Sequence, residues 1–239
     1  MSETREVDIS VILPGFNEED NIELAVMAHL RALKSAGLDH EIIVVNDCST
    51  DRTGQIADAM ATLHPVVRVL HNPVNLNVGI SLLIGMRAAR GRVVIHNAFD
   101  LPFDPCDIKT VVSRFDDADL VVVVRSGRDA HSYWRKVTSI VHHWLIRILF
   151  LVKIRDFNFI QAYKREVVTS LDIKAKSPAF VTPELIIRAA RSGYKIREVP
   201  AKFHPRERGA GSFGRPRDIF WALADMMSFW IETIWSRRR

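Results

Sequence analysis

Two apolar runs near the start of the chain, each ending abruptly in small and acidic residues, constrain the fold more than any other feature. They are Ile9-Ser-Val-Ile-Leu-Pro-Gly-Phe-Asn-Glu-Glu-Asp20 and Glu41-Ile-Ile-Val-Val-Asn-Asp-Cys-Ser-Thr-Asp51. Such runs are typical of fully buried parallel strands, and open α/β sheets bind ligands at the carboxyl ends of these strands. The residues expected there suit a nucleotide better than a simple anion; they are Pro14, Asn17, Glu18, Asp47, Ser49 and Asp51.

Strand-like and helical stretches alternate along the chain. The strand-like runs are 9–14, 41–46, 66–71, 92–97, 119–125 and 196–203. The helical patterns between the early runs are 18–36, 52–63 and 77–90. This alternation predicts an α/β fold with a Rossmann-like, mostly parallel sheet and helices on both faces. Gly37, Gly91 and Gly193 stand where helices are expected to end, and Asp104-Pro105 is typical of a helix start.

Length and cysteine content set the expected organisation. The 239 residues suffice for one α/β domain with a short extension, and we expect the domain over 1–205 and the extension over 206–239. Cys48 and Cys106 are too few for a disulfide framework, and we find no signal-peptide pattern. No apolar stretch has the length of a membrane span. These features favour a cytoplasmic protein.

Two later helical patterns have broad apolar faces. The pattern over 132–152 gathers on one face Trp134, Val137, Ile140, Val141, Trp144, Leu145 and Ile148. In 218–236 one sector is mainly acidic and holds Asp218, Asp225, Ser228, Glu232 and Ser236. The opposite sector holds Phe220, Leu223, Met226, Met227, Trp230, Ile231 and Ile234. This pattern is typical of an amphipathic membrane-surface helix, and also of a helix that packs on the sheet or on a second subunit.

Positive charge gathers at the end of the chain. The formal net charge is only +5, but seven arginines lie between Arg206 and Arg239 against four acids. No nucleic-acid-binding motif accompanies them, so we expect no nucleic-acid partner. Anionic lipids or phosphate-bearing substrates fit such a patch better.

The two opening runs resemble family 2 inverting glycosyltransferases with the GT-A fold. The segments Val11-Ile-Leu-Pro-Gly-Phe-Asn-Glu-Glu19 and Val44-Val-Asn-Asp-Cys-Ser-Thr-Asp51 carry the resemblance. It is closest to the branch that contains dolichol-phosphate mannosyltransferase and other polyprenyl-phosphate glycosyltransferases, and it extends over about 7–213. The resemblance implies a GT-A sheet and a nucleotide-diphosphate sugar donor.

Three of the residues in these segments are expected to bind the nucleotide. Asp47 lies just beyond a buried strand, and the resemblance implies that it contacts the base. Where relatives have two adjacent acids, this chain has Asn46-Asp47, so the first carboxylate is absent. Asn17 and Glu18 are expected to bind nucleotide or else to cap the first helix. For Asp51 we favour a helix cap alone.

The segment Gly91-Arg-Val-Val-Ile-His-Asn-Ala-Phe-Asp100 occupies the place of the family's metal-binding Asp-X-Asp. A divalent cation there neutralises the charge that develops on a diphosphate leaving group. Asn97 and Phe99 interrupt the family pattern and Asp100 is its clear acid. The resemblance therefore implies Mg²⁺ or Mn²⁺ bound by Asp100, with Asn97 as a neutral second contact.

Three further segments are expected to meet phosphate or acceptor. Asp156 precedes a run that matches a family segment, and it would orient or deprotonate the acceptor or else form an ion pair with Arg155 or Arg165. The segment His204-Pro-Arg-Glu-Arg-Gly-Ala-Gly-Ser212 resembles the family's Arg-x-x-Gly-x-Ser loop, which implies that Arg206 and Ser212 contact the diphosphate. Arg125 and Arg128 follow a strand end and are placed to hold an acceptor phosphate.

The sequence thus predicts a metal-dependent glycosyltransferase. It would transfer a sugar from a nucleotide-diphosphate sugar to a polyprenyl phosphate with inversion, while bound peripherally to the cytoplasmic face of a membrane. Two alternatives stay open: transfer to a soluble or protein-linked sugar acceptor, and a non-catalytic subunit that binds nucleotide sugars. A homo-oligomer is also compatible with the apolar helices.

Overall fold

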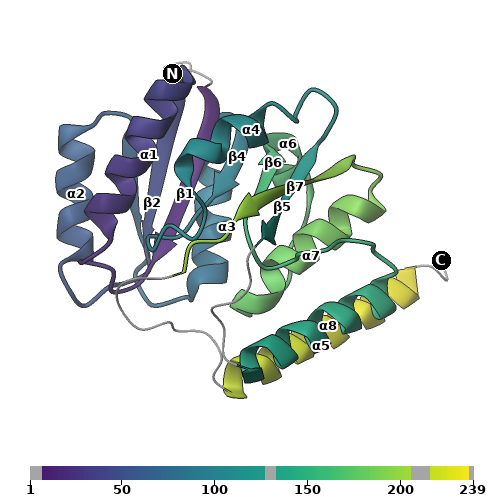
Figure 1. Ribbon diagram of the computed structural model, residues 1–239. Helices are drawn as coiled ribbons and strands as arrows, with labels where there is room; N and C mark the ends of the chain where they lie inside the picture. The colour runs from purple at the N-terminus through teal and green to yellow at the C-terminus, as the bar shows by residue number, and fades with distance from the viewer. Residues whose placement is uncertain (1–6, 127–132, 206–215, 237–239) are drawn as a thin grey trace.

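The computed structural model describes residues 7–126, 133–205 and 216–236 (Figure 1). For 133–139, 216 and 236 it describes the backbone alone. Within these residues, seven strands form one sheet in the order β3-β2-β1-β4-β6-β5-β7. The strands are β1 Val7–Gly15, β2 His40–Asn46, β3 Val67–His71, β4 Gly91–His96, β5 Leu120–Ser126, β6 Gln161–Lys164 and β7 Ile196–Lys202. β6 runs antiparallel to β4 and β5, and the other neighbours pair in parallel. The predicted mostly parallel α/β sheet is confirmed.

Helices cover both faces of this sheet. They are α1 Ile22–Ala36, α2 Thr53–Leu63, α3 Val78–Ala88, α4 Ile108–Val112, α5 Tyr133–Phe150, α6 Arg165–Ser170, α7 Pro178–Arg191 and α8 Pro216–Ser236, with a 3-10 turn at Pro105–Asp107. Alternate side chains of each central strand point to opposite faces. Leu13 packs in the core beneath α1, α2 and α4, whereas its neighbour Ile12 packs in the core beneath α3, α6 and α7. Burial on both faces explains why the strand sequences are continuously apolar.

Register brings the carboxyl ends of three strands to one edge. In β1, Gly15 pairs with Asn46 of β2, while Ile12 pairs with His96 of β4. Asp47 and Asn97, which follow β2 and β4, therefore lie on either side of the end of β1. The polar residues predicted from the two opening runs are gathered at this edge.

Two of the three predicted glycine caps are confirmed. Gly37 and Gly193 have φ of +70° and +82° at helix ends, a conformation that glycine adopts without steric cost. The prediction for Gly91 is wrong, because α3 ends at Ala88 and Gly91 opens β4. A Cβ at Gly91 would lie 2.4 Å from the backbone N of Ser10. Glycine is therefore required there for the close approach of β4 to β1.

Helix α8 turns two residues of its acidic sector, Asp225 and Glu232, toward the body of the protein. Asp225 bonds backbone N–H groups just before α7, and Glu232 pairs with Arg188 of α7. Met226 and Phe229 are buried, and the Phe229 ring stacks on Phe150 of α5 at a centroid distance of 5.1 Å. The two helices consequently lie side by side below the sheet (Figure 1).

The outward faces of α5 and α8 are apolar. The exposed side chains are Ile140, Val141, Trp144, Ile148, Leu151, Ile219, Phe220, Trp221, Leu223, Met227, Ile231 and Trp235. We call this set the α5–α8 apolar face. Large apolar side chains exposed on two neighbouring helices are typical of an interaction surface. None of the helices that the structure describes has the length and hydropathy needed to cross a membrane.

Candidate active site

A cavity of about 260 Å³ opens at the sheet edge where β1 and β4 end. Its lining comes from β1, the starts of α3 and α7, the turn after β4, the end of β5 and the segment before β6. The polar or charged lining residues are His96, Asn97, Asp100, Arg125, Asn158 and Thr182. Pro14 lines it as predicted, and Phe159 and Phe203 supply aromatic walls.

Asp47 is buried at the end of β2 and, like Asn17 and Glu18, is not among the residues that line this cavity. Its Oδ1 accepts hydrogen bonds from Asn72 Nδ2 and from the backbone N of Leu76, both at 2.8 Å. Asn72 Nδ2 also donates to Ser81 Oγ at 2.8 Å. These contacts fix the carboxylate at a strand end with 1% of the residue exposed. Sequence reasoning missed Asn72 and Ser81, because neither belongs to a motif.

Asn17 bridges the two opening loops instead of capping α1. Its Oδ1 accepts from the backbone N of Thr50 at 2.8 Å, and its Nδ2 donates to Thr50 Oγ1 at 3.1 Å. Its φ of +55° is uncommon outside glycine. Glu18 Oε2 accepts from Asn21 Nδ2 just before α1, but no side chain caps the first backbone N–H groups of α1, so neither residue takes the alternative role of helix cap.

Asp51 lies at the start of α2, as favoured from the sequence. Its Oδ1 accepts from Thr53 N at 2.9 Å, and its Oδ2 accepts from the backbone N of Glu19 at 3.2 Å. Burial raises its pKa, but the hydrogen bonds from Thr53 and Glu19 outweigh that effect and lower it overall. The carboxylate is therefore held by the protein's own amides.

The amide that replaces the family's first acid is also held in place. Asn46 Nδ2 lies 2.9 Å from His71 Nδ1, and its Oδ1 accepts from the backbone N of Ser49. His71 Nε2 in turn lies 3.0 Å from Asp58 Oδ1 on α2. Asn46 thus shapes the loop that follows Asp47.

The turn after β4 presents Asp100 to the cavity. Phe99 is buried against the end of β1, where a Cβ on Gly15 would lie 2.4 Å from its ring. The buried amide of Asn97 donates to the carbonyl of Phe103 at 2.9 Å and lies 3.1 Å from His29 Nε2. Asn97 therefore anchors this turn from the core side, and its metal contact stays a prediction.

Asp156 is fully buried and paired with Arg125 rather than with Arg155 or Arg165. Arg125 Nε donates to Oδ2 at 2.8 Å and Nη2 donates to Oδ1 at 3.1 Å, while Arg155 pairs with Glu198. Burial raises the pKa of Asp156, but hydrogen bonds from His143 and Arg125 together with the Arg125 charge hold it well below its usual range. A carboxylate with such a pKa is a weak base.

His96 is a cavity residue that the sequence did not single out. Its Nε2 lies 2.7 Å from Gln161 Oε1. Burial lowers its pKa to about 4, so the ring is neutral near pH 7. The position of His96 at the end of a strand, directly before Asn97, could have identified it as a site residue from the sequence. Three predicted phosphate contacts, Arg128, Arg206 and Ser212, lie outside the described residues.

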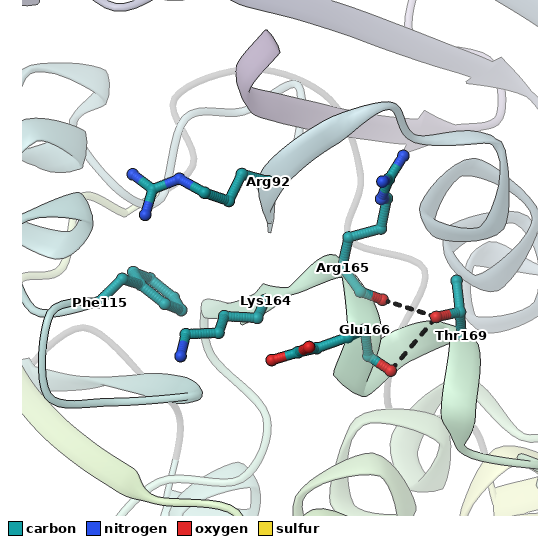
Figure 2. Close-up of a pocket in the computed structure, with 6 residues that line it drawn as sticks. All are labelled: Arg92, Phe115, Lys164, Arg165, Glu166 and Thr169. Carbon is teal, nitrogen blue, oxygen red and sulfur yellow. Dashed lines mark hydrogen bonds between the residues drawn. The ribbon is translucent and has the colours of Figure 1, made fainter. Parts of the chain in front are cut away.

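A larger hollow of about 470 Å³ lies at the opposite edge of the sheet, where β4 begins and β6 ends. The Arg92 and Lys164 side chains extend to the same side there, whereas the guanidinium of Arg165 points away from them (Figure 2). Lys164 Nζ is paired with Asp119 Oδ1 at 2.7 Å. These groups do not converge on one ligand, so the smaller cavity is the better candidate.

Residues 10–169 match the family model described as glycosyl transferase family 2. This protein belongs to glycosyl transferase family 2. The glycosyltransferase AglD of Haloferax volcanii is 29% identical, over 94% of this chain and 37% of its own length. Dodecaprenyl-phosphate galacturonate synthase of Rhizobium johnstonii is 27% identical, over 93% of this chain and 66% of its own. Undecaprenyl-phosphate 4-deoxy-4-formamido-L-arabinose transferase of Edwardsiella ictaluri is 28% identical, over 86% of this chain and 63% of its own length.

This family 2 chain thus spans from 37% to 66% of the length of these relatives. Among solved structures, it is similar to glucosyl-3-phosphoglycerate synthase of Mycobacterium tuberculosis in complex with Mn²⁺, uridine diphosphate and phosphoglyceric acid. The TM-score is 0.70 at 26% identity, covering 93% of this chain and 78% of that one. The predicted GT-A fold and the resemblance to family 2 are confirmed.

Proposed function

We propose that this protein transfers a sugar from a nucleotide-diphosphate sugar to a polyprenyl phosphate, with inversion at the sugar carbon. The observation that carries the proposal is the α5–α8 apolar face, because α8 packs on α7 and the start of α7 lines the cavity. A surface of this kind suits an acceptor held in a membrane. The names of the Rhizobium and Edwardsiella relatives, which specify dodecaprenyl and undecaprenyl phosphate, support the same acceptor class.

The donor nucleotide would bind where β1 and β2 end. In this proposal Asp47 accepts a hydrogen bond from the base or ribose, with Pro14, Asn17 and Glu18 forming the rest of the nucleotide site. The two hydrogen bonds that hold Asp47 in place favour this role, since a fixed carboxylate loses little entropy on binding. The structure of the mycobacterial neighbour in complex with uridine diphosphate supports a nucleotide ligand for this fold.

Mg²⁺ or Mn²⁺ would be held by Asp100, whose carboxylate lines the cavity. The residues fit such an ion, because Mg²⁺ commonly takes one or two protein carboxylates and completes its shell with phosphate oxygens and water. The cation would neutralise charge on the leaving diphosphate. The protein would hold Asp100 rigidly, because Phe99 packs on β1 and Asn97 is anchored in the core.

The acceptor phosphate would meet Arg125, which lines the cavity and is oriented by Asp156. Two hydrogen bonds to Asp156 fix the guanidinium plane and leave other N–H groups for a phosphate. A phosphate acceptor is already largely ionised near neutral pH, so Asp156 serves here by orienting Arg125. Arg128 would add to the acceptor site, and Arg206 with Ser212 would contact the diphosphate, as the family resemblance implies.

The α5–α8 apolar face would seat the protein peripherally on the cytoplasmic face of a membrane. Its twelve side chains include three tryptophans, which favour the interface between lipid and water. Asp225 and Glu232 turn inward to protein partners, which would reduce the repulsion between α8 and anionic lipid.

A nucleotide-sugar panel tests the donor half of this proposal. Melting temperatures are measured with each nucleotide sugar, with and without Mn²⁺. At least one donor is expected to raise the melting temperature more with Mn²⁺ than without it, because a ligand that binds only the folded state stabilises it. A panel that produces no metal-dependent shift would contradict the donor site.

A further inference from the structure

We infer that Asp225, on the outer helix α8, is a positioning residue for the wall of the cavity; this rests on the proposed function. Asp225 Oδ2 accepts hydrogen bonds from the backbone N–H groups of Lys176 and Ser177, at 2.9 and 2.7 Å. These amides directly precede α7, and a carboxylate is electrostatically favoured at the N-terminal end of a helix. Asp225 therefore fixes the start of α7 from a helix that lies outside the cavity.

The start of α7 is itself part of the cavity wall. Pro178, Val181 and Thr182 line the cavity. The Ser177 carbonyl accepts from the backbone N of Val181 at 3.2 Å, which makes the first turn rigid. Thr182 Oγ1 donates to the carbonyl of Phe157 at 3.1 Å, next to the buried Asp156. A displacement of Ser177 would thus reach both the cavity wall and the segment that holds Arg125.

The same loop also holds the start of α3. Asn77 Nδ2 donates to the carbonyl of Lys176 at 3.0 Å, and Asn77 Oδ1 accepts from the backbone N of Gly79 at 2.9 Å. The two helix starts are in close contact, since a Cβ on Gly79 would lie 2.9 Å from Pro178 Cα. Gly79 and its neighbour Val78 line the cavity. Asp225 is thus one contact away from two walls of the cavity.

Glu232 provides a matched control on the same helix. It lies seven residues, two helical turns, beyond Asp225 and faces the same way. Its carboxylate pairs with Arg188 Nη2 and with Lys174 Nζ, both at 3.1 Å. Neither Arg188 nor Lys174 lines the cavity. Glu232 therefore holds α8 to the body without touching the cavity wall.

Transfer kinetics with a short, water-soluble polyprenyl phosphate distinguish the two acids. We expect Asp225→Ala to lower kcat/KM by about 10-fold to 100-fold, because small displacements of positioning groups cost this much. The kcat/KM of Glu232→Ala is expected to stay within about twofold of the wild-type value. The melting temperatures of the two alanine variants should change by similar amounts. Asp225→Asn should recover most of the loss, since its amide oxygen can accept from both N–H groups. Equal losses in the two alanine variants, or no recovery by asparagine, would overturn the inference.

Amide hydrogen exchange on the full chain tests the same inference without activity. Amides in 176–182 and 78–82 are expected to exchange at least about tenfold faster in Asp225→Ala than in Glu232→Ala, because local opening becomes easier when a helix start loses its acceptor. Equal exchange in the two variants would overturn the positioning role. Absence of transfer by the wild type would instead contradict the proposed function, so the two failures can be told apart.

Discussion

The guanidinium of Arg125 donates one hydrogen bond to each carboxylate oxygen of Asp156, at 2.8 and 3.1 Å. The pair joins the end of β5 to the segment before β6, and Arg125 also lies over the ring of Phe159, 5.4 Å from its centroid. Asp156 is fully buried, whereas 16% of the Arg125 side chain is exposed. The geometry makes Asp156 the support and Arg125 the group that faces the cavity.

Replacement of Asp156 by Asn should destabilise the protein at neutral pH by about 3–5 kcal/mol, because it leaves the Arg125 charge partly buried without its partner. Denaturant unfolding measures the free energy of unfolding for both proteins. An unchanged value at pH 7 would contradict the proposed support of Arg125.

The difference between wild type and Asp156→Asn should also depend on pH. The pKa of Asp156 is lower in the folded state than in the unfolded state, so its stabilisation is present above the unfolded pKa, about 3.9. It is lost as pH falls through the folded pKa. Unfolding experiments from pH 7 down to pH 2 should show the difference shrink only at the acidic end, and a difference independent of pH would contradict the assignment.

Asp100→Asn should lower turnover by about a hundredfold or more while the melting temperature stays near that of the wild type, because a cation at the diphosphate would lose its protein carboxylate. Asp104→Asn is a matched control, since Asp104 caps the next turn by accepting from Cys106 N and does not line the cavity. Equal losses in both variants, or normal Mn²⁺-dependent rates in Asp100→Asn, would remove Asp100 from the metal site.

Asp47→Ala should weaken binding of free nucleoside diphosphate by about tenfold or more, since hydrogen bonds to charged groups contribute about 1.5–3 kcal/mol. Calorimetry measures this affinity directly. Asp58→Asn, on α2 and bonded to His71, serves as the control and should bind normally. Unchanged affinity in the Asp47 variant would place the base elsewhere.

Much of the fold was predictable because its signals are local. The continuous apolar sequences of 9–14 and 41–46 indicate buried strands by themselves. Asp47 and Asn97 come directly after strands, so their place at the strand ends was predictable. β6 escaped notice because four residues, Gln161–Lys164, are too short to display a strand period. Gly193 predicted the end of α7, but the start and extent of this helix were not predicted, because Pro178 and Pro183 interrupt its helical pattern.

The contacts that complete the site join segments far apart in the sequence, so no local pattern shows them. Arg125 and Asp156 are 31 positions apart, and Asp225 is 48 from Ser177. No local pattern shows that Asp225 and Glu232 of α8 face inward, since their partners are backbone amides before α7 and Arg188 within it. Tertiary partners decided the direction in which this amphipathic helix faces.

Membrane association should depend on the outward side chains of α8. Replacing Phe220, Ile231 and Trp235 together by Ser removes three exposed large side chains, each contributing up to about 1.5–3 kcal/mol when fully removed from water. Co-sedimentation with vesicles of mixed neutral and anionic lipid should then fall sharply, while nucleotide affinity stays unchanged. If the triple variant instead alters the oligomeric state and still sediments with vesicles, the face is a subunit interface.

The most direct test is transfer of a labelled sugar from a nucleotide-diphosphate sugar to a polyprenyl phosphate, with the product analysed by mass and anomeric configuration. We predict a lipid-linked sugar phosphate of inverted configuration, formed only with Mg²⁺ or Mn²⁺ and about a hundredfold or more slowly by Asp100→Asn. Formation of a glycosylated soluble acceptor in preference to the lipid product, or a retained configuration, would contradict the proposed reaction.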